Sequence, residues 1–406
     1  MSERRCDEGE LLVARQPILD GTLEVAGYEL LFRAPGAHGA HVDDAERATS
    51  QVIVDAIGDI GLDRLAGARP AYVNVSRELL LAVRPLPLPC DRVVLEVLEG
   101  QTVDAELVAV VGELAAAGFV LALDDFVYQP ALEPLLDVAR IVKLDVLALG
   151  REGTLRQLDR LRGRGLRLVA EKVETEGEFA FCRDAGFDLF QGYFYQRPEL
   201  VRGRGASAAR LGSVHTLAAL QRAGGSFERL DEVIRHDAGL SYKLIRFANS
   251  ASVGARSPAG SVREALVRLG SRTVQQWATL LAMAGIPDRP AELLTTALLR
   301  ARTCQTLAAD AKDACPDRAF VVGLFSVLDA LLGVPMDEVL ELLALDRDVA
   351  DALESRSGAE GAALAAVVAY EHGMAPDAPG AVSERAVGAA YRDALAWTQT
   401  IGTALT

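Results

Sequence analysis

Eight short apolar runs in the first two hundred residues constrain the fold more than any other feature of this 406-residue chain. The runs are rich in Val, Leu and Ile, and most are separated by segments with helical periodicity. Strands of this kind, each followed by a helix, are typical of a parallel sheet that helices cover. The expected strands are Leu11–Leu19, Val25–Phe32, Ala71–Val75, Val93–Val97, Phe119–Leu123, Ile141–Leu144, Leu166–Ala170 and Leu189–Gly192.

The number of strands indicates which α/β fold the first half adopts. Helical periodicity falls at Ala45–Ile60, Asp104–Ala117, Gly153–Arg162 and Glu176–Ala185. Eight strands with intervening helices predict a TIM-like (β/α)₈ barrel at the small end of its size range. A doubly wound open sheet is the alternative. We expect the barrel domain to span residues 10–200.

From residue 206 onward, Ala/Leu-rich segments with a period near 3.6 replace the strand pattern, which predicts an all-α domain over residues 206–406. Ser261-Val262-Arg263-Glu264 has the spacing of a capping box, and prolines at 287, 290, 316 and 335 separate later helices. The expected linker is Val201–Ala209, whose Arg-Gly-Arg-Gly segment offers no apolar anchor.

Composition narrows the class of protein. Acidic residues outnumber basic ones by 57 to 42, a net charge of −15, which argues against nucleic-acid and anionic-membrane partners. Five cysteines without zinc-ligand spacing indicate free thiols in a reducing compartment. The N-terminus lacks a signal-peptide pattern, and no apolar run reaches 18 residues. We therefore expect a cytoplasmic protein with no membrane span.

Polar residues on the apolar strands are the strongest functional signal. A charge in or at the end of a buried strand is costly unless it is paired or bound to a metal. The C-terminal strand ends of a barrel converge on one mouth, where active sites of this fold lie. The residues concerned are Glu29, Asn74, Glu96, Asp124, Asp125, Lys143, Glu171 and Gln191.

Carboxylates that meet at one mouth repel one another unless a cation lies between them. Oxygen ligands suit Mg²⁺, Mn²⁺ or Ca²⁺ rather than zinc. The alternative is structural, since a single acid at a strand end, such as Asp125, also serves as a helix N-cap. Lys143 is a second signal because the chain has only four lysines, at 143, 172, 243 and 312. A compact ammonium can bond a water or phosphate oxygen where a guanidinium does not fit.

At these residues the first half resembles the EAL family, barrel phosphodiesterases that open cyclic di-GMP. The match covers most of residues 11–200. The motifs are Gln16-Pro17-Ile18, Glu29-Leu30-Leu31 with Arg33, Asn74-Val75-Ser76, Glu96, Asp124-Asp125-Phe126, Lys143-Leu144-Asp145, Glu171-Lys172-Val173-Glu174 and Gln191-Gly192-Tyr193.

The resemblance implies roles for these residues. Glu29, Asn74, Glu96, Asp124 and Asp125 correspond to ligands of Mg²⁺ or Mn²⁺. Lys143 corresponds to the residue that holds the attacking water, and Glu171 to the general base or a further ligand. Gln16, Arg33 and Gln191 are the expected substrate contacts. The substrate implied is cyclic di-GMP.

One loop departs from the family pattern. Where active members read Asp-Asp-Phe-Gly-Thr-Gly, this chain reads Asp124-Asp125-Phe126-Val127-Tyr128-Gln129, which lacks both glycines and makes positive φ costly there. In the family this loop shapes the metal site and couples it to dimerisation, so a homodimer is compatible with the resemblance. Glu99 matches the glutamate that steadies the loop. The sequence leaves open whether catalysis survives this change of the loop, is weakened by it or is lost.

The second half resembles the HDOD family, non-hydrolytic relatives of HD phosphohydrolases, from about residue 210 to 373. Asp237-Ala238-Gly239-Leu240, the segment Lys243–Ser250 and the capping-box segment carry the match. His236-Asp237 has no second histidine cluster, so we interpret Asp237 as a helix cap and His236 as incidental. Asn249 and Ser250 are expected to bond the backbone, and Trp277, Phe320 and Phe325 to be core.

Three functional hypotheses follow. The first is a bacterial cyclic di-GMP phosphodiesterase that works by metal-assisted water attack, with the HDOD domain as a module for an unknown protein partner. The second is a catalytically silent receptor for the nucleotide. The third is a scaffold in which neither domain binds nucleotide.

Overall fold

The computed structural model describes residues 12–33, 60–82, 86–98, 101–196, 208–249, 259–286, 289–343, 345–374 and 382–405. The chain divides into two compact units. The first comprises Met1–Tyr195 together with the short segment Tyr370–Ala375, and the second comprises Gln196–Ala369 and Pro376–Thr406. In the described segments, no helix has both the length and the apolar character needed to cross a membrane.

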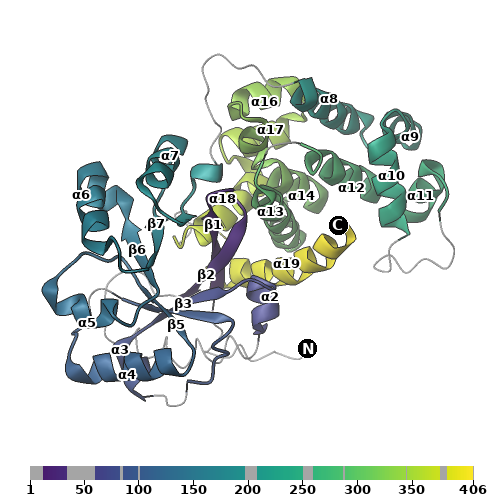
Figure 1. The fold of residues 1–406 in the computed structure, drawn as a ribbon. Coiled ribbons are helices and arrows are strands. Elements are labelled where there is room, and N and C mark those ends of the chain that lie inside the picture. The colour runs from purple at the N-terminus through teal and green to yellow at the C-terminus, as the bar shows by residue number, and fades with distance from the viewer. Residues whose placement is uncertain are drawn as a thin grey trace, which may run out of the picture. The chain divides into compact units, whose positions relative to one another are not determined.

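The first unit is a closed eight-stranded barrel, which confirms the predicted fold class (Figure 1). Its strands follow one another around the barrel in chain order. They are β1 (Leu12–Asp20), β2 (Val25–Arg33), β3 (Ala71–Val75), β4 (Val93–Val97), β5 (Val120–Leu123), β6 (Ile141–Asp145), β7 (Arg167–Glu171) and β8 (Leu189–Gln191). All eight expected strands are therefore present, with ends displaced by no more than a few residues.

The direction of β1 corrects the expectation of an all-parallel sheet. β1 is antiparallel to both of its neighbours, β2 and β8. Only a tight turn joins β1 to β2, in which the Asp20 carboxylate accepts hydrogen bonds from the N–H groups of Thr22 and Glu24. A connection this short cannot hold the crossover that parallel neighbours need, so the two strands form a hairpin.

Helices lie outside the strands of the barrel (Figure 1). They are α2 (Leu62–Ala66), α3 (Arg77–Ala82), α4 (Ala105–Ala116), α5 (Glu133–Leu136), α6 (Val146–Leu161) and α7 (Glu176–Ala185), with short 3₁₀ turns η1 (Pro130–Leu132) and η2 (Phe194–Gln196). Asp104, Asp145 and Thr175 cap α4, α6 and α7 through their side chains. The helix expected over Ala45–Ile60 lies almost wholly outside the described residues.

The second unit contains only helices among its described residues. They are α8 (Ala208–Ala223), α9 (Phe227–Arg235), α10 (Ala238–Ala248), α11 (Val262–Leu269), α12 (Ser271–Met283), α13 (Ala291–Ala309), α14 (Pro316–Phe325), α15 (Leu328–Leu332), α16 (Met336–Leu343), α17 (Arg347–Glu354), α18 (Gly358–Glu371) and α19 (Glu384–Leu405). α8 begins inside the expected linker, at Ala208. Pro290 and Pro316 lie at the starts of α13 and α14, as their missing N–H groups allow.

A leucine-rich core joins α8 to α12. Leu220, Leu230, Leu244, Leu266 and Val274 are fully or almost fully buried in it. Ser261 caps α11 as predicted, because its hydroxyl accepts from the Glu264 N–H. The capping box itself is incomplete, since the Glu264 carboxylate accepts from Gly260 rather than from Ser261.

Candidate active site

The site is formed by alternate side chains of the barrel strands, which face the interior. An interior cluster of Ile18, Tyr72, Val94, Ala122, Ile141, Val169 and Leu189 fills the barrel. Because alternate side chains point to the same face, the residue two positions farther along a parallel strand faces the interior one layer higher. Those residues are Asn74, Glu96, Asp124, Lys143, Glu171 and Gln191. On antiparallel β1 the step runs backwards, from Ile18 to Gln16, which pairs with Glu29 of β2.

Lys143 lies at the centre of this layer and is completely buried. Its Nζ atom is 2.7 Å from Glu96 Oε1, 2.8 Å from Asp124 Oδ1, 2.8 Å from Glu171 Oε1 and 3.1 Å from Glu29 Oε2. An ammonium has three N–H donors, one fewer than the carboxylates around it. If all five groups are ionised the layer carries a formal charge of −3, so one lysine does not neutralise it.

Glu29 receives hydrogen bonds from strands on both sides of β2. Asn74 Nδ2 donates to Glu29 Oε1 at 3.1 Å, and Gln191 Nε2 donates to Glu29 Oε2 at 2.7 Å. Gln191 Nε2 also lies 2.8 Å from Gln16 Oε1, which links β8 to β1. The side chains from β1, β2, β3 and β8 therefore form one connected network with Lys143.

The carboxylates differ in pKa because their donors differ. Burial alone raises the pKa of Glu29, but the Lys143 charge and the bonds from Gln191 and Asn74 outweigh it and hold the pKa below its ordinary value. Burial and the Glu29 charge raise the pKa of Glu96 well above its ordinary value. Burial, opposed by Lys143, raises the pKa of Glu171 to about 8. The donors of the layer therefore do not stabilise all of its carboxylates in the ionised form.

Buried oxygen atoms in the layer also outnumber the hydrogen bonds available to them. Glu96 Oε2, Glu171 Oε2 and Asn74 Oδ1 are buried and accept no hydrogen bond in the part of the chain that the structure describes. Glu96 Oε1 and Asp124 Oδ1 lie within ion-pair distance of Lys143 but outside hydrogen-bonding geometry. Such atoms normally have a partner, and a bound ion is one of the groups that can supply it.

The donor set fits a hard divalent cation, since it consists of carboxylate and amide oxygens. Within the described ranges, however, no three Asp, Glu, His or Cys side chains form a ready metal-binding group. The carboxylates converge on the Lys143 ammonium instead. The residue types and the buried oxygens without hydrogen bonds therefore support a metal site. The positions of the side chains, however, are those of an ion cluster centred on Lys143.

Asp125 departs from the expected arrangement. Its carboxylate contacts Lys172 Nζ at 3.4 Å, and Lys172 Nζ lies 2.5 Å from Asp145 Oδ2. Both Asp125 (φ 42°) and Lys172 (φ 55°) have positive φ without being glycine. Strained backbone of this kind concentrates at functional sites. Lys172 and Asp145 were absent from the expected site residues. The signal that could have identified them is their place in the motifs Glu171-Lys172-Val173-Glu174 and Lys143-Leu144-Asp145.

The structure thus brings together most of the predicted residues in one layer. They are Gln16, Glu29, Asn74, Glu96, Asp124, Lys143, Glu171 and Gln191. Asp125 forms a second, more exposed ion cluster with Lys172. Arg33 ends β2, but its side chain lies outside the described residues, as does Glu99.

The altered loop after Asp125 is held by side chains rather than by glycine. None of Val127, Tyr128 and Gln129 has a positive φ. The Tyr128 hydroxyl donates to Glu133 Oε1 at 2.7 Å, and its N–H donates to the side chain of Gln157 on α6 at 2.9 Å. The loop therefore avoids the conformational cost that the sequence alone led us to expect.

The His-Asp pair of the helical unit makes local contacts. Asp237 caps α10 by accepting from the Leu240 N–H at 2.9 Å, as predicted. His236 Nδ1 lies 2.7 Å from the Glu232 carbonyl oxygen. Asn249 exchanges two hydrogen bonds with the backbone of Ala259, and Ser250 lies outside the described residues. Both members of the pair are thus used locally.

Sequence similarity to known proteins extends over both halves of the chain. The EAL domain model matches residues 2–198, and the HDOD domain model matches residues 213–371. Cyclic di-GMP phosphodiesterase CdgJ of Vibrio cholerae is 38% identical over 362 residues, which cover 87% of this chain and 83% of that protein. The uncharacterized protein YuxH of Bacillus subtilis is 30% identical over 84% of this chain and 86% of its own length. The chain belongs to the EAL–HDOD family.

Among solved structures, the EAL–HDOD protein is similar to a standalone EAL protein from Vibrio cholerae O395 in its c-di-GMP-bound form. That match has 23% identity and a TM-score of 0.37, and it covers 46% of this chain and 92% of the other. An EAL domain protein from Listeria monocytogenes matches 46% of this chain with 20% identity and a TM-score of 0.38.

Proposed function

We propose that the EAL barrel hydrolyses cyclic di-GMP to the linear dinucleotide by attack of water on one phosphodiester bond. The observation that carries the proposal is the buried layer in which four carboxylates surround Lys143. A charge cluster of this kind is expensive in a protein interior and concentrates at functional sites. The relative CdgJ, which is described as a cyclic di-GMP phosphodiesterase, supports the choice of substrate.

The proposed metal ligands are Glu29, Asn74, Glu96, Asp124 and Asp125, which supply oxygen atoms only. When bound, a pair of Mg²⁺ or Mn²⁺ ions lowers the pKa of a coordinated water and offsets charge on the phosphodiester oxygens. Glu96 Oε2 and Asn74 Oδ1 are available for this role because neither accepts a hydrogen bond within the described residues.

The remaining residues of the layer position the reactants. The Lys143 ammonium can donate to the attacking water or to a phosphate oxygen. Glu171 lies beside it, at 2.8 Å, as the proposed acceptor of the proton that the water loses. The proposed substrate contacts are Gln16 and Gln191, which are hydrogen-bonded to each other on the neighbouring strands β1 and β8, and Arg33 at the end of β2.

The HDOD unit is proposed as the output module that binds a protein partner. Its His-Asp pair is used for a helix cap and a backbone contact, which leaves the chemistry to the barrel. A homodimer is the proposed assembly, and cytoplasm the proposed location.

The test is turnover by the full chain with Mg²⁺ or Mn²⁺, followed by separation of the cyclic and linear dinucleotides. We expect the linear product from the wild type and none from Glu29→Ala. Glu152→Ala is the matched control, because Glu152 is an exposed glutamate on α6 outside the site. Turnover that is absent, or equal in Glu29→Ala and the wild type, would contradict the proposal.

The second candidate is a nucleotide receptor without catalysis. The altered loop favours it, because Val127-Tyr128-Gln129 replaces the pattern of active members. A receptor binds cyclic di-GMP without forming product and loses affinity in Arg33→Ala. The same assay, run beside a binding titration, therefore separates the two candidates.

A further inference from the structure

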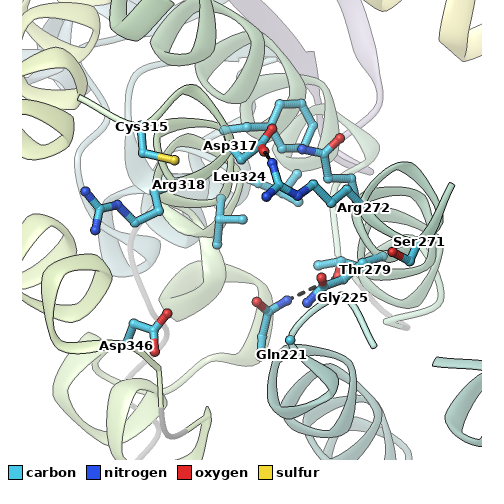
Figure 2. A pocket seen from close by; sticks show the side chains of 15 residues that line it. Gln221, Gly225, Ser271, Arg272, Thr279, Cys315, Asp317, Arg318, Leu324 and Asp346 are labelled. Carbon is cyan, nitrogen blue, oxygen red and sulfur yellow. Dashed lines mark hydrogen bonds and ion pairs between the residues drawn. The ribbon is translucent and has the colours of Figure 1, made fainter. Parts of the chain in front are cut away.

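The helical unit contains a cavity of about 530 Å³ that the proposed phosphodiesterase activity does not use. It is lined by residues from the end of α8, one face of α12, the length of α14 and Asp346 at the start of α17 (Figure 2). Its volume lies within the range of roughly 300–1,000 Å³ that small-molecule sites occupy. Along α12, Ser271, Gln275 and Thr279 line the cavity at intervals of four residues, while Val274 and Ala278 pack in the core on the other face.

One wall of the cavity presents amide oxygens whose orientation is fixed. Gln221 Nε2 donates to Thr279 Oγ1 at 3.2 Å, and Gln275 Nε2 donates to the Leu220 carbonyl at 2.8 Å. One N–H of each NH₂ group is engaged, which fixes the orientation of both amides and leaves each Oε1 to accept from a ligand. Gly225 has no side chain, and a Cβ atom at this position would lie 3.9 Å from Gln275 Oε1. The absence of that atom leaves space in the cavity beside this oxygen.

Apolar side chains of α14 line another part of the cavity. Leu324 is fully buried and Phe320 is 5% exposed, with Val321 beside them. Thr279, which is 2% exposed, adds a hydroxyl for which no acceptor is recorded within the described chain. A flat, partly apolar group that carries N–H donors matches both this surface and the amide wall.

The rim carries an arginine that can change partners. The Arg272 guanidinium contacts Asp317 Oδ2 at 2.8 Å, and its side chain is 81% exposed (Figure 2). An exposed ion pair of this kind contributes little, so an anionic group can replace Asp317. Arg272 also lies in the first turn of α12, whose N-cap Gly270 offers no side-chain acceptor. Free N–H groups at a helix start favour an anion there.

We propose that this cavity binds a purine nucleoside monophosphate. The base lies against Phe320 and Val321 and donates its N–H groups to Gln221 and Gln275. The phosphate lies at the rim beside Arg272 and the start of α12. Binding here is independent of the barrel, and it gives the HDOD unit a small-molecule input of its own.

The test measures binding of radiolabelled GMP and AMP to the full chain by equilibrium dialysis, with inorganic phosphate and guanosine as competitors. Loss of the charge-assisted contact in Arg272→Ala is expected to weaken binding roughly tenfold. Gln275→Leu, which keeps the side chain's bulk, is expected to weaken it as well. Arg263→Ala is the matched control, because Arg263 is an exposed arginine of α11 outside the cavity. Affinity unchanged in Arg272→Ala and Gln275→Leu would overturn the proposal.

A thiol in the cavity wall locates the bound ligand. Cys315 lines the cavity and is half-buried, whereas Cys90, also half-buried, belongs to the barrel unit. At ten times Kd, nucleotide occupancy is expected to slow alkylation of Cys315 by iodoacetamide about tenfold by mass action, with Cys90 unchanged. Protection by phosphate alone as strong as by GMP overturns the proposal in favour of a simple anion site. Nucleotide binding that survives both cavity variants overturns it in favour of the barrel.

Discussion

The Lys143 ammonium lies 2.7 Å from Glu96 Oε1, and neither side chain is exposed to solvent. Burying an ion pair costs desolvation energy that is recovered only when the remaining polar atoms also find partners. Glu96 Oε2 has none within the described chain. The pair is therefore poorly explained by stability, and its position among three further carboxylates is better explained by chemistry that needs them.

Removing the lysine leaves buried carboxylates without a counter-ion. In metal-free protein, Lys143→Met is expected to lower the free energy of unfolding by about 3–5 kcal/mol, the usual cost of breaking a buried ion pair. Urea unfolding in EDTA measures the difference. Turnover is expected to be lost as well, because Lys143 positions the reactants.

The control for that experiment is the other lysine near the site. Lys172 is 51% exposed and pairs with Asp125 and Asp145. Since exposed ion pairs contribute about 0–1 kcal/mol, Lys172→Met is expected to change stability by no more than that. Equal losses in the two variants would show that burial of Lys143 is not the source of its effect.

Metal binding is expected to stabilise the barrel. At a hundred times Kd, Mg²⁺ or Mn²⁺ that binds only the folded state raises the free energy of unfolding by about 2.7 kcal/mol. Glu96→Gln removes a charged donor and is expected to reduce that gain, while Glu152→Gln on the exposed face of α6 leaves it intact. Thermal unfolding with and without the ion measures both, and a gain unchanged in Glu96→Gln contradicts the ligand assignment.

Much of the barrel site could be predicted because the period of two is a local property of the sequence. Glu96, Asp124 and Glu171 each follow an interior residue by two positions, so their side chains face inward once the strand positions are right. Asp125 could not be placed in the same way. Its backbone turns to a positive φ at the end of β5, and its carboxylate meets Lys172, which is distant in sequence.

The antiparallel direction of β1 could have been predicted from the length of the loop that follows it, but not from the composition of the strand. Four residues separate Asp20 from Val25, which suits a hairpin. The cavity beside α12 could not be predicted, because it depends on how α8, α12 and α14 pack. Gln221 and Gln275 look like ordinary exposed amides until their bonds to Thr279 and Leu220 are known.

Restoring the family's glycines in the loop is expected to bring no gain. Because Val127, Tyr128 and Gln129 have negative φ, glycine is not required for the conformation they adopt. The triple variant Val127→Gly, Tyr128→Thr, Gln129→Gly also removes the Tyr128 hydroxyl from Glu133 and adds freedom to the unfolded chain. Turnover is expected to stay equal or fall. A large rise in kcat would show instead that the loop limits catalysis.

Cys182 is expected to resist alkylation in the folded protein. Burial on α7 raises the pKa of its thiol to about 12, with the Glu178 charge acting in the same direction. The reactive thiolate is therefore almost absent near pH 8. Peptide mass spectrometry after iodoacetamide treatment is expected to find Cys90 modified and Cys182 unmodified, and both modified only after denaturation.

Glu360 is expected to give the helical unit part of its acid sensitivity. Burial alone raises its pKa, but a hydrogen bond from the Cys315 N–H and the contacts of Arg318 lower it below the ordinary value of 4.5. A carboxyl with a lowered folded-state pKa contributes stability above its unfolded pKa and loses it as pH falls through the folded one. Glu360→Gln is thus expected to lower Tm at pH 7 and to narrow its gap to wild type below pH 4. Glu354→Gln, at the end of α17, is the control, and a gap that does not change with pH would assign the Glu360 effect to packing rather than to charge.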